Sequence, residues 1–340
     1  MQSTILKSPL ILAVLLWLGV GQMIACAWET RTISGREYVA VDGMKEFYNF
    51  DSVKRSGNQI IFDKTDPKDK RKGVLLTLRT GSQECFMNKV KFVFSYQVED
   101  NGGRAWISRI DLAKLVDPVL RPNYIANAGA FDTVIIDAGH GGKDPGATNG
   151  IGTEAGYNLD VAERLRKLLI AQKYKVIMTR DSNRYLTLQE RVDVANRVQG
   201  NAIFISIHHN SGGSAARGIE TFTLSPVGVS HYGRGLNSSD FQARTGNSHD
   251  SANVALATAV HGRVSRRLGK NTFDRGIKRA RFSVLTGVKH PSILIECGFM
   301  THQLEARLIH NEAYRNAVAM GISEAIKTYQ VAVSKKSTTP

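Results

Sequence analysis

The order of apolar patterns in the second part of this 340-residue chain constrains the fold most. Short runs rich in Val and Ile, typical of buried strands, alternate with longer segments whose apolar residues recur at helical spacing. The strand-like runs are 133–137, 175–178, 202–207, 218–224 and 292–296, and the helical segments are 154–172, 188–198, 252–268 and the chain from 302 onward. This alternation predicts an α/β domain in which a mostly parallel sheet carries helices on both faces.

The first part of the chain has a different pattern. Gly and Asn separate β-rich runs at 38–41, 59–62, 74–78 and 90–94, and two short helical pieces lie at 44–48 and 110–115. We expect Asp117-Pro118 to end the second helical piece and residues up to 130 to form a linker. The predicted organisation is a small α+β domain at 28–126, the α/β domain at 127–330, and a disordered tail at 331–340.

Residues 1–27 have the features of a signal peptide. Lys7 precedes an apolar run at 10–20, and Ala25-Cys26-Ala27 fits the small-x-small pattern read by signal peptidase, which predicts cleavage before Trp28. The run is shorter than the roughly 20 residues that span a bilayer. Cys26 leaves a lipid anchor open as an alternative, and an uncleaved N-terminal helix is another. All three readings place the rest of the chain outside the cytoplasm, in the periplasm or cell envelope.

Composition narrows the class of protein. The 42% apolar content excludes a disordered chain, and 45 Lys and Arg against 30 Asp and Glu give a net charge of +15. The charge favours an anionic partner, and for an exported protein a wall polymer or a membrane surface fits better than nucleic acid. Cys85 and Cys297 are the cysteines left after cleavage; they lie in different predicted domains, so we expect both to be reduced and packed, in a monomer held together by its core.

Four polar residues stand where predicted strands, loops and helices meet: His140, Glu154, His208 and Glu296. The carboxyl ends of strands in open α/β sheets are the usual place for sites. A catalytic zinc site needs three protein ligands and an open position for water, and two imidazoles with one carboxylate are a known set. A second carboxylate is then needed to move the water's proton. The four residues together match these requirements, although no short HExxH-type motif is present.

Most of the second part also resembles a known family. The blocks that carry the resemblance, in chain order, are Ile136-Asp-Ala-Gly-His-Gly-Gly-Lys-Asp-Pro-Gly-Ala147 with Glu154, Thr179-Arg-Asp181, Leu186-Thr-Leu-Gln-Glu-Arg-Val-Asp-Val-Ala-Asn196, Phe204-Ile-Ser-Ile-His-His-Asn210, Arg275-Gly-Ile-Lys-Arg-Ala280 with Val284-Leu285, and Pro291-Ser-Ile-Leu-Ile-Glu-Cys-Gly-Phe299. From about Thr133 to Tyr329 the chain is similar to the zinc-dependent N-acetylmuramoyl-L-alanine amidases of the Amidase_3 family.

The resemblance implies a function and roles for residues. His140, Glu154 and His208 would bind one Zn²⁺, and Glu296 would be the catalytic carboxylate. The implied reaction is hydrolysis of the peptidoglycan amide between N-acetylmuramic acid and L-alanine of the stem peptide, in wall turnover or cell separation. A zinc peptidase acting within the stem and a non-catalytic wall-binding protein remain alternatives. The resemblance leaves open whether a protein activator is a further partner.

Several neighbouring residues have expected roles. His209 competes with His208 as a ligand, but successive side chains of a strand point to opposite faces, so one ion is bound by one of them, and the family register favours His208. Asn210, Arg275 and Lys278 are candidates for substrate binding, the two cations through stem-peptide carboxylates. Asp137 is expected to stiffen the loop that holds His140, Arg180 to fix a turn, and Glu190 and Arg191 to pair near a helix face.

Two further segments carry expectations. The polar stretch 225–251 occupies the place where some family members have a helix that blocks the metal, but its glycines disfavour a stable helix, which predicts an open or loop-rimmed cleft. Residues 28–126 resemble the copper-amine-oxidase-type N-terminal domain of cell-envelope enzymes, through Arg36-Glu-Tyr-Val39 and the stretch 104–113. This segment contains no His, so the resemblance implies wall binding or scaffolding without copper.

Overall fold

The computed structural model describes residues 28–66, 68 and 73–334. The predicted signal peptide at 1–27, with the cleavage site and Cys26, lies outside the described residues, as do 335–340. Among the described helices, none combines the length and the apolar character that crossing a membrane requires.

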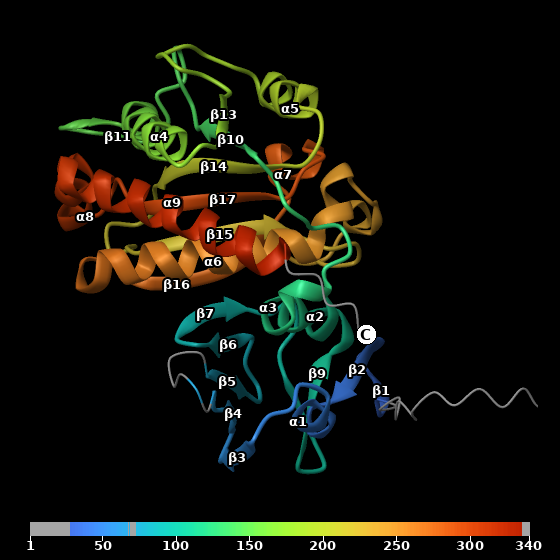
Figure 1. Cartoon of the computed structure of the whole chain (residues 1–340). Coiled ribbons are helices and arrows are strands. Elements are labelled where there is room, and N and C mark those ends of the chain that lie inside the picture. The colour runs from blue at the N-terminus through green and yellow to red at the C-terminus, as the bar shows by residue number, and fades with distance from the viewer. Residues whose placement is uncertain (1–27, 67, 69–72, 335–340) are drawn as a thin grey trace, which may run out of the picture.

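One large twisted sheet runs through the molecule (Figure 1). From one edge to the other its strands are β13 (Lys175–Met178), β10 (Thr133–Ala138), β14 (Ala202–Asn210), β17 (Ser292–Phe299), β15 (Ile219–Leu224), β16 (Asp274–Ala280), β7 (Val90–Val93), β6 (Glu84–Met87), β5 (Val74–Arg79), β4 (Gln59–Lys64) and β3 (Ser52–Ser56). The first six come from the predicted α/β domain and the last five from the N-terminal part.

The directions of the strands match the predicted α/β class. β13, β10, β14 and β17 are parallel, and so are β15 and β16. β15 runs antiparallel to β17, which reverses the direction in the middle of the sheet. β16 was not predicted as a strand, because Asp274–Ala280 is rich in charged residues whose partners come only from the tertiary structure.

Helices cover both faces of this part of the sheet, as expected. α4 (Glu154–Ala171), α6 (Asp250–Leu268) and α9 (Glu312–Ser334) pack on one face, and α5 (Leu188–Arg197) and α7 (Ser283–Gly287) on the other (Figure 1). Side chains of β14 alternate between the two resulting clusters: Ile203, Ile205 and Ile207 join the first and Phe204 the second. This alternation is the period-two pattern of a strand buried on both faces.

The C-terminal boundary and the cysteines test two further expectations. α8 (Gln303–His310) is followed directly by α9, which continues to Ser334, so the tail predicted from residue 331 is wrong for its first four residues. Apolar residues such as Val333 extend the buried face of α9 beyond 330. Cys85 and Cys297 are both free and buried, which confirms the prediction of reduced, packed residues.

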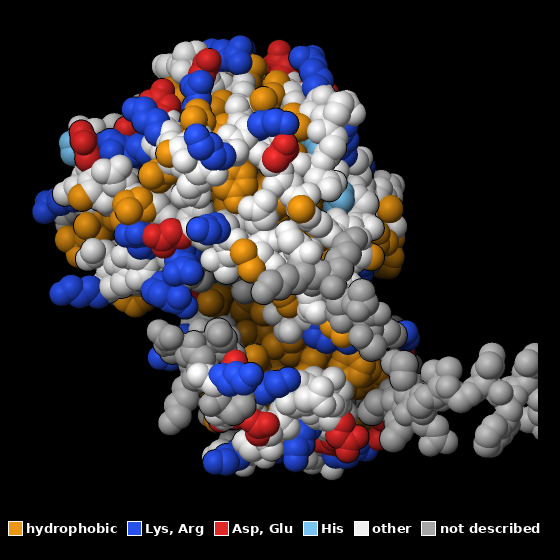
Figure 2. Space-filling view, in the orientation of Figure 1, with side chains coloured by type: hydrophobic (Ala, Val, Ile, Leu, Met, Phe, Trp, Pro, Cys, Tyr) orange, Lys and Arg blue, Asp and Glu red, His pale blue; other side chains and the backbone are white. Residues whose placement is uncertain are grey.

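The N-terminal part joins the large sheet through a single pairing, between Ile277 of β16 and Phe92 of β7. A second sheet, β1 (Thr30–Ile33), β2 (Arg36–Ala40), β9 (Arg104–Ser108) and β8 (Glu99–Asn101), and the short α1 (Met44–Phe47) complete this α+β lobe. Apolar side chains gather in the hollow at the waist between the two lobes (Figure 2).

The expected helix end at Asp117-Pro118 is wrong. α2 (Arg109–Asp111), a π-helical turn (Leu112–Val116) and α3 (Asp117–Leu120) follow one another without a break. Proline has no N–H to donate to the carbonyl four residues earlier, which here belongs to Lys114. Arg279 of β16 donates to that carbonyl instead, at 3.0 Å. A distant side chain therefore satisfies the group that the proline leaves without a partner.

The polar stretch predicted at 225–251 ends at 249, before α6 begins, and this segment 225–249 does not rim the cleft, so the loop-rimmed alternative of the prediction is wrong. β15 is antiparallel to β17. The C-terminal end of β15, at Leu224, therefore lies at the opposite ends of the strands from His208 and Glu296. The segment contains two short 3-10 turns, Ser238–Phe241 and Thr245–His249, and no longer helix, which agrees with the predicted lack of an occluding helix. Among the described residues, no hydrogen bond, ion pair or ring contact joins it to the four candidate residues.

Candidate metal centre

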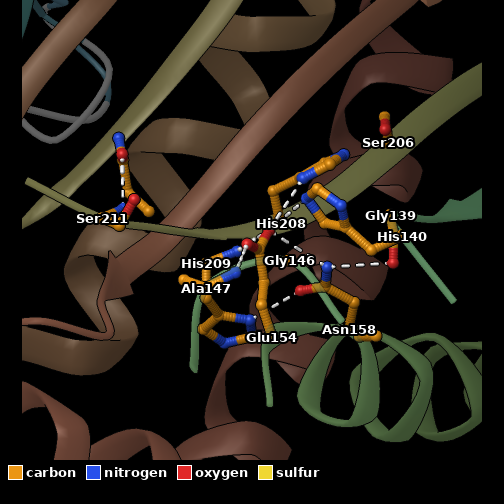
Figure 3. Close-up of polar contacts among 12 residues, drawn as sticks. Gly139, His140, Gly146, Ala147, Glu154, Asn158, Ser206, His208, His209 and Ser211 are labelled. Carbon is orange, nitrogen blue, oxygen red and sulfur yellow. Dashed lines mark hydrogen bonds and ion pairs between the residues drawn. The ribbon is translucent and has the colours of Figure 1, made fainter. Parts of the chain in front are cut away.

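Two imidazoles and one carboxylate meet at the carboxyl end of the parallel strands (Figure 3). His140 lies in the loop after β10, Glu154 is the first residue of α4, and His208 lies near the end of β14. One ligand atom from each lies within 4.8 Å of the others. His140 Nε2 is 3.2 Å and His208 Nδ1 is 2.9 Å from the same Glu154 oxygen, Oε1. The structure thus brings together all three predicted ligands.

Glycines allow this close approach. A Cβ on Gly139 would lie 2.2 Å from the His208 ring, and a Cβ on Gly146 would lie 2.6 Å from Glu154 Oε2. His140 itself has a φ of 59°, in the left-handed region that costs a non-glycine residue roughly 1 kcal/mol or more. A strained ligand-bearing loop persists only where its surroundings fix it.

A buried polar network behind the loop supplies that support. Asp137 accepts hydrogen bonds from Thr179, Ser206 and Arg191 at 2.7–2.8 Å. Arg191 also donates to the carbonyl of His140 at 2.8 Å. Burial alone would raise the pKa of Asp137, but the charge of Arg191 and these hydrogen bonds hold it below its usual value. The predicted stiffening role of Asp137 agrees with these contacts.

Two arginines of this network differ in how well the sequence predicted them. Arg180 was expected to fix a turn, and it donates to the carbonyls of Ala138, Gly139 and Ala155 at 2.8 Å. Arg191 was expected to pair with Glu190 near a helix face, which is wrong. Glu190 instead closes a capping box at the start of α5, and Arg191 points into the interior toward Asp137.

Hydrogen bonds orient two of the three candidate ligands. Asp144 Oδ2 lies 2.8 Å from His140 Nδ1, which leaves Nε2 facing Glu154. Glu154 Oε2 accepts from the N–H of Ala147 at 2.9 Å. Burial would raise the pKa of Glu154, but hydrogen bonds from His140 and His208 lower it strongly, so the carboxylate stays ionised. A fixed imidazole nitrogen and an ionised carboxylate are the states that bind a cation.

His209 points to the other face of β14, so the structure brings His208 rather than His209 to the cluster. Its Nδ1 lies 2.8 Å from Asn158 Oδ1, and Asn158 Nδ2 donates to Glu154 Oε1 at 3.3 Å (Figure 3). His209 therefore supports Glu154 from behind through Asn158. The sequence analysis did not identify Asn158, although its position one helical turn after Glu154 places the two on one face of α4.

Glu296 lies beside His208 in the parallel pairing of β17 with β14. The residue is half-buried, and its Oε2 is buried without a hydrogen-bond partner among the described residues. Burial, followed by the charges of Glu154 and Glu220, raises the pKa of Glu296 well above the usual carboxyl value. A buried polar atom without a partner is rare and marks a place where chemistry or a ligand is expected.

The three predicted substrate-binding residues converge on a carboxylate that the sequence analysis missed. Glu220 of β15 lies opposite Glu296. It accepts from Asn210 Nδ2 at 2.7 Å and from Arg275 Nε at 2.9 Å, and it forms an ion pair with Lys278 Nζ. An acidic residue inside the apolar run 218–224 was the available sequence signal. Glu220 neutralises part of the positive charge that Arg275 and Lys278 bring to the site.

The donor set fits a zinc ion, because two imidazole nitrogens and one carboxylate oxygen are a known catalytic ligand set for that metal. The unpartnered oxygen of Glu296 lies on the same side of the sheet as His208, where a general base is required. An α/β sheet that presents these groups at the carboxyl ends of its parallel strands defines a metal-dependent hydrolase.

Comparison with known proteins gives the family. The family model described as N-acetylmuramoyl-L-alanine amidase, Amidase_3, matches residues 134–328, which is more than half of the chain. The chain therefore belongs to the N-acetylmuramoyl-L-alanine amidase family, and the predicted enzyme class, a hydrolase of peptidoglycan, is confirmed. The N-terminal lobe lies outside the match, so its resemblance to the copper-amine-oxidase-type domain and its wall-binding role stay predictions.

The chain is also similar to individual proteins. The chain is 33% identical over 197 residues to the uncharacterized protein YqiI of Bacillus subtilis (strain 168), covering 58% of this chain and 84% of that protein. It is 30% identical over 207 residues to the N-acetylmuramoyl-L-alanine amidase LytC of the same organism, covering 61% of this chain but 37% of LytC. Among solved structures, the catalytic domain of CwlV from Bacillus (Paenibacillus) polymyxa var. colistinus is 32% identical with a TM-score of 0.49, covering 59% of this chain and 99% of that one.

Proposed function

We propose that this amidase holds a zinc ion with His140, Glu154 and His208, and that Glu296 moves the proton as the amide between N-acetylmuramic acid and L-alanine is hydrolysed. The observation that carries the proposal is the convergence of the three donor atoms within 4.8 Å beside the buried, unpartnered oxygen of Glu296. When bound, zinc supplies a Lewis acid that polarises the scissile carbonyl and makes water a stronger nucleophile near neutral pH.

The side chains of the protein have separable tasks in this proposal. Glu296 takes a proton from the attacking water as general base and returns it to the leaving amine as general acid, a role typically worth about 10²–10⁴ in rate. Asp144 keeps the proton of His140 on Nδ1, and the Ala147 N–H holds Glu154 in place. The strand pairing of β14 with β17 fixes Glu296 next to His208.

The predicted substrate-binding residues are not equally available. The side chain of Arg275 is 35% exposed and that of Lys278 is 4% exposed. Arg275 is therefore the better candidate to bind a stem-peptide carboxylate, whereas Lys278 and Asn210 hold Glu220 in position. This division keeps Arg275 as a substrate contact and assigns the other two to the wall of the site.

A digestion experiment tests the function. The mature chain is added to purified sacculi without any other protein, and the released fragments are identified by mass spectrometry. Intact stem peptides that begin with L-alanine support the amidase, internal stem cuts indicate a peptidase, and absence of release indicates a wall-binding protein or a need for an activator. Release by the mature chain alone would also support an open cleft that needs no activator.

The zinc assignment is tested on the same material. Metal content is measured for the wild type, for His208→Ala and for Glu296→Gln, with Glu163→Gln on the exposed surface of α4 as a matched control. We expect one zinc per chain in the wild type and in both glutamine variants, and loss of zinc in His208→Ala. Full turnover by Glu296→Gln would remove Glu296 from its role.

We also propose that the protein is exported and cleaved before Trp28. This is tested by determining the N-terminal residue of the protein recovered from the cell envelope, with Trp28 expected.

A further inference from the structure

A cavity of about 360 Å³ lies between the N-terminal lobe and the segment 225–249. Gln83 and the stretch Val93–Ser95 line it from the lobe, Val229–Arg234 from the other side, and Arg279 of β16 from the sheet. The exposed Gly233 and Arg234 lie at its mouth, while Arg279 is only 4% exposed. None of the candidate metal ligands lines this cavity, and its volume falls in the range of small-molecule sites, about 300–1,000 Å³.

The polar atoms of the cavity are incompletely satisfied. Arg279 Nη2 donates to the carbonyl of Lys114, but its Nε and Nη1 are buried and have no hydrogen-bond partner among the described residues. The hydroxyl of Ser95 is also buried and without a partner in the described part of the chain. A buried guanidinium is costly unless acceptors satisfy its N–H groups, so these two side chains require an acceptor that the described residues do not supply.

Neighbouring charges are already paired, and Arg279 is the exception. Arg234 and Arg281 share the buried Asp240, and Lys114 Nζ lies 3.9 Å from Asp250. Within residues 28–66, 68 and 73–334, Arg279 forms no ion pair.

Nearby acids do not satisfy the guanidinium by hydrogen bonding. Asp111 acts on the charge of Arg279 through space, but its carboxylate oxygens accept from the N–H groups of Ser95 and Tyr96 and from the Ser108 hydroxyl. Asp250 also acts on this charge through space and forms no hydrogen bond with it. The base of the cavity therefore carries a buried guanidinium whose Nε and Nη1 have no acceptor among the described residues.

We propose that this cavity binds a small oxyanion, a carboxylate or phosphate group, through the guanidinium of Arg279 and the hydroxyl of Ser95. The planar guanidinium presents parallel N–H groups that match the oxygens of either group, and an anion supplies only acceptors, which is what the cavity lacks. Because residues from both lobes line the cavity, the bound anion would also strengthen the contact between the lobe and the segment 225–249.

The test is binding of inorganic phosphate to the full mature chain, measured by calorimetry and by the shift in unfolding temperature, with sodium chloride at equal ionic strength as reference. We expect saturable binding in the wild type and at least about tenfold weaker binding in Arg279→Gln, since a charge-assisted hydrogen bond is worth about 1.5–3 kcal/mol. Ser95→Ala, a small change that preserves packing, should weaken binding about fivefold, in line with one neutral hydrogen bond. Arg166→Gln, on the exposed surface of α4, is the matched control and should bind as the wild type does.

Further arms identify the source of the anion. Acetate and a soluble muropeptide are titrated in competition with phosphate. Competition by the muropeptide assigns the site to carboxylates of the wall polymer, and phosphate binding without such competition assigns it to free phosphate. Absence of saturable binding by every anion overturns the proposal. So does unchanged phosphate binding in Ser95→Ala together with Arg279→Gln, provided that circular dichroism shows both variants folded.

Discussion

Two carboxylates of the catalytic half, those of Asp137 and Glu296, differ in how they are paired. Behind the loop that carries His140, Asp137 and Arg191 are buried, and their hydrogen bonds run to each other and to the loop. Glu296, beside His208 in the sheet, has a buried oxygen without a hydrogen-bond partner among the described residues. Under the proposed function, pairing rather than residue type separates the two roles: a hydrogen-bonded carboxylate fixes geometry, and one without a partner is free to exchange protons.

The largest expected effect comes from changing Glu296, whose buried oxygen has no hydrogen-bond partner among the described residues. Glu296→Gln should lower turnover of sacculi by about 10²–10⁴, the usual worth of a general acid–base group. Stability should be unchanged or slightly higher, because the change removes a carboxylate whose ionised form is disfavoured by burial. Kinetics and thermal unfolding measured on the same sample check both halves. A variant that loses stability in proportion to activity would contradict the comparison.

Changing Asp137, the hydrogen-bonded carboxylate, should lower stability, in contrast to Glu296→Gln. Asp137→Asn leaves Arg191 buried without its counter-charge, and breaking a buried ion pair costs about 3–5 kcal/mol of stability. Chemical denaturation compares this variant with Glu296→Gln, which serves as its control. We expect a clear drop in the denaturation midpoint for Asp137→Asn alone. Equal midpoints for the two variants would show that the two groups do not differ in this way.

His209 tests whether support extends to the face of β14 away from the metal centre. His209→Leu removes the contact with Asn158 that holds Glu154 from behind, and loss of such an outer contact typically weakens metal affinity about tenfold or more. Zinc affinity is measured by competition with a chelator. His209→Asn, which keeps a polar group at the position, should recover part of the loss. Unchanged zinc affinity in His209→Leu would show that His209 does not support the metal ligands, which leaves the Asp137 network as their support.

The smallest expected effect is a dependence of stability on pH. The pKa of Asp137 is lower in the folded protein than the ordinary value for an aspartate, so its ionised form stabilises the fold. This contribution is fully present above the unfolded pKa and is lost as the pH falls through the lower folded pKa. The stability difference between wild type and Asp137→Asn should therefore narrow below about pH 4. Denaturation at pH 6 and at pH 3 measures it, and a constant difference would exclude Asp137 as its source.

Much of the catalytic half was predictable because its local patterns agree with its tertiary structure. The strands at 133–138 and 202–210 are long apolar runs, and α4 begins at Glu154 behind the capping residue Thr153, as helical spacing indicated. Two elements outside these patterns were harder, one in each part of the chain. β16 is too charged to read as a strand, and Pro118 reads as a helix end, because each depends on a partner far away in sequence: Glu220 for Lys278 and Arg279 for the Lys114 carbonyl.

The residues of the candidate site also divide into those that the sequence predicted and those that it did not. The residue types of His140, Glu154, His208 and Glu296, and their places at the ends of elements, come from the sequence. Glu220 was missed, because its meaning depends on the antiparallel pairing that sets it opposite Glu296. The segment 225–249 was expected at the strand ends that carry the site, and it lies at the opposite ends for the same reason. The apolar pattern of a strand does not reveal whether it runs parallel or antiparallel to the next strand.

The amino-acid sequence by itself determined the α/β class, the family and the chemistry of the four site residues, because periodicity and side-chain type are local properties. The tertiary structure alone decided that five N-terminal strands extend the same sheet, and which charged groups have no hydrogen-bond partner among the described residues. Strand order, strand direction and burial arise from contacts between segments far apart in the chain, and the local pattern of each segment is compatible with several such arrangements.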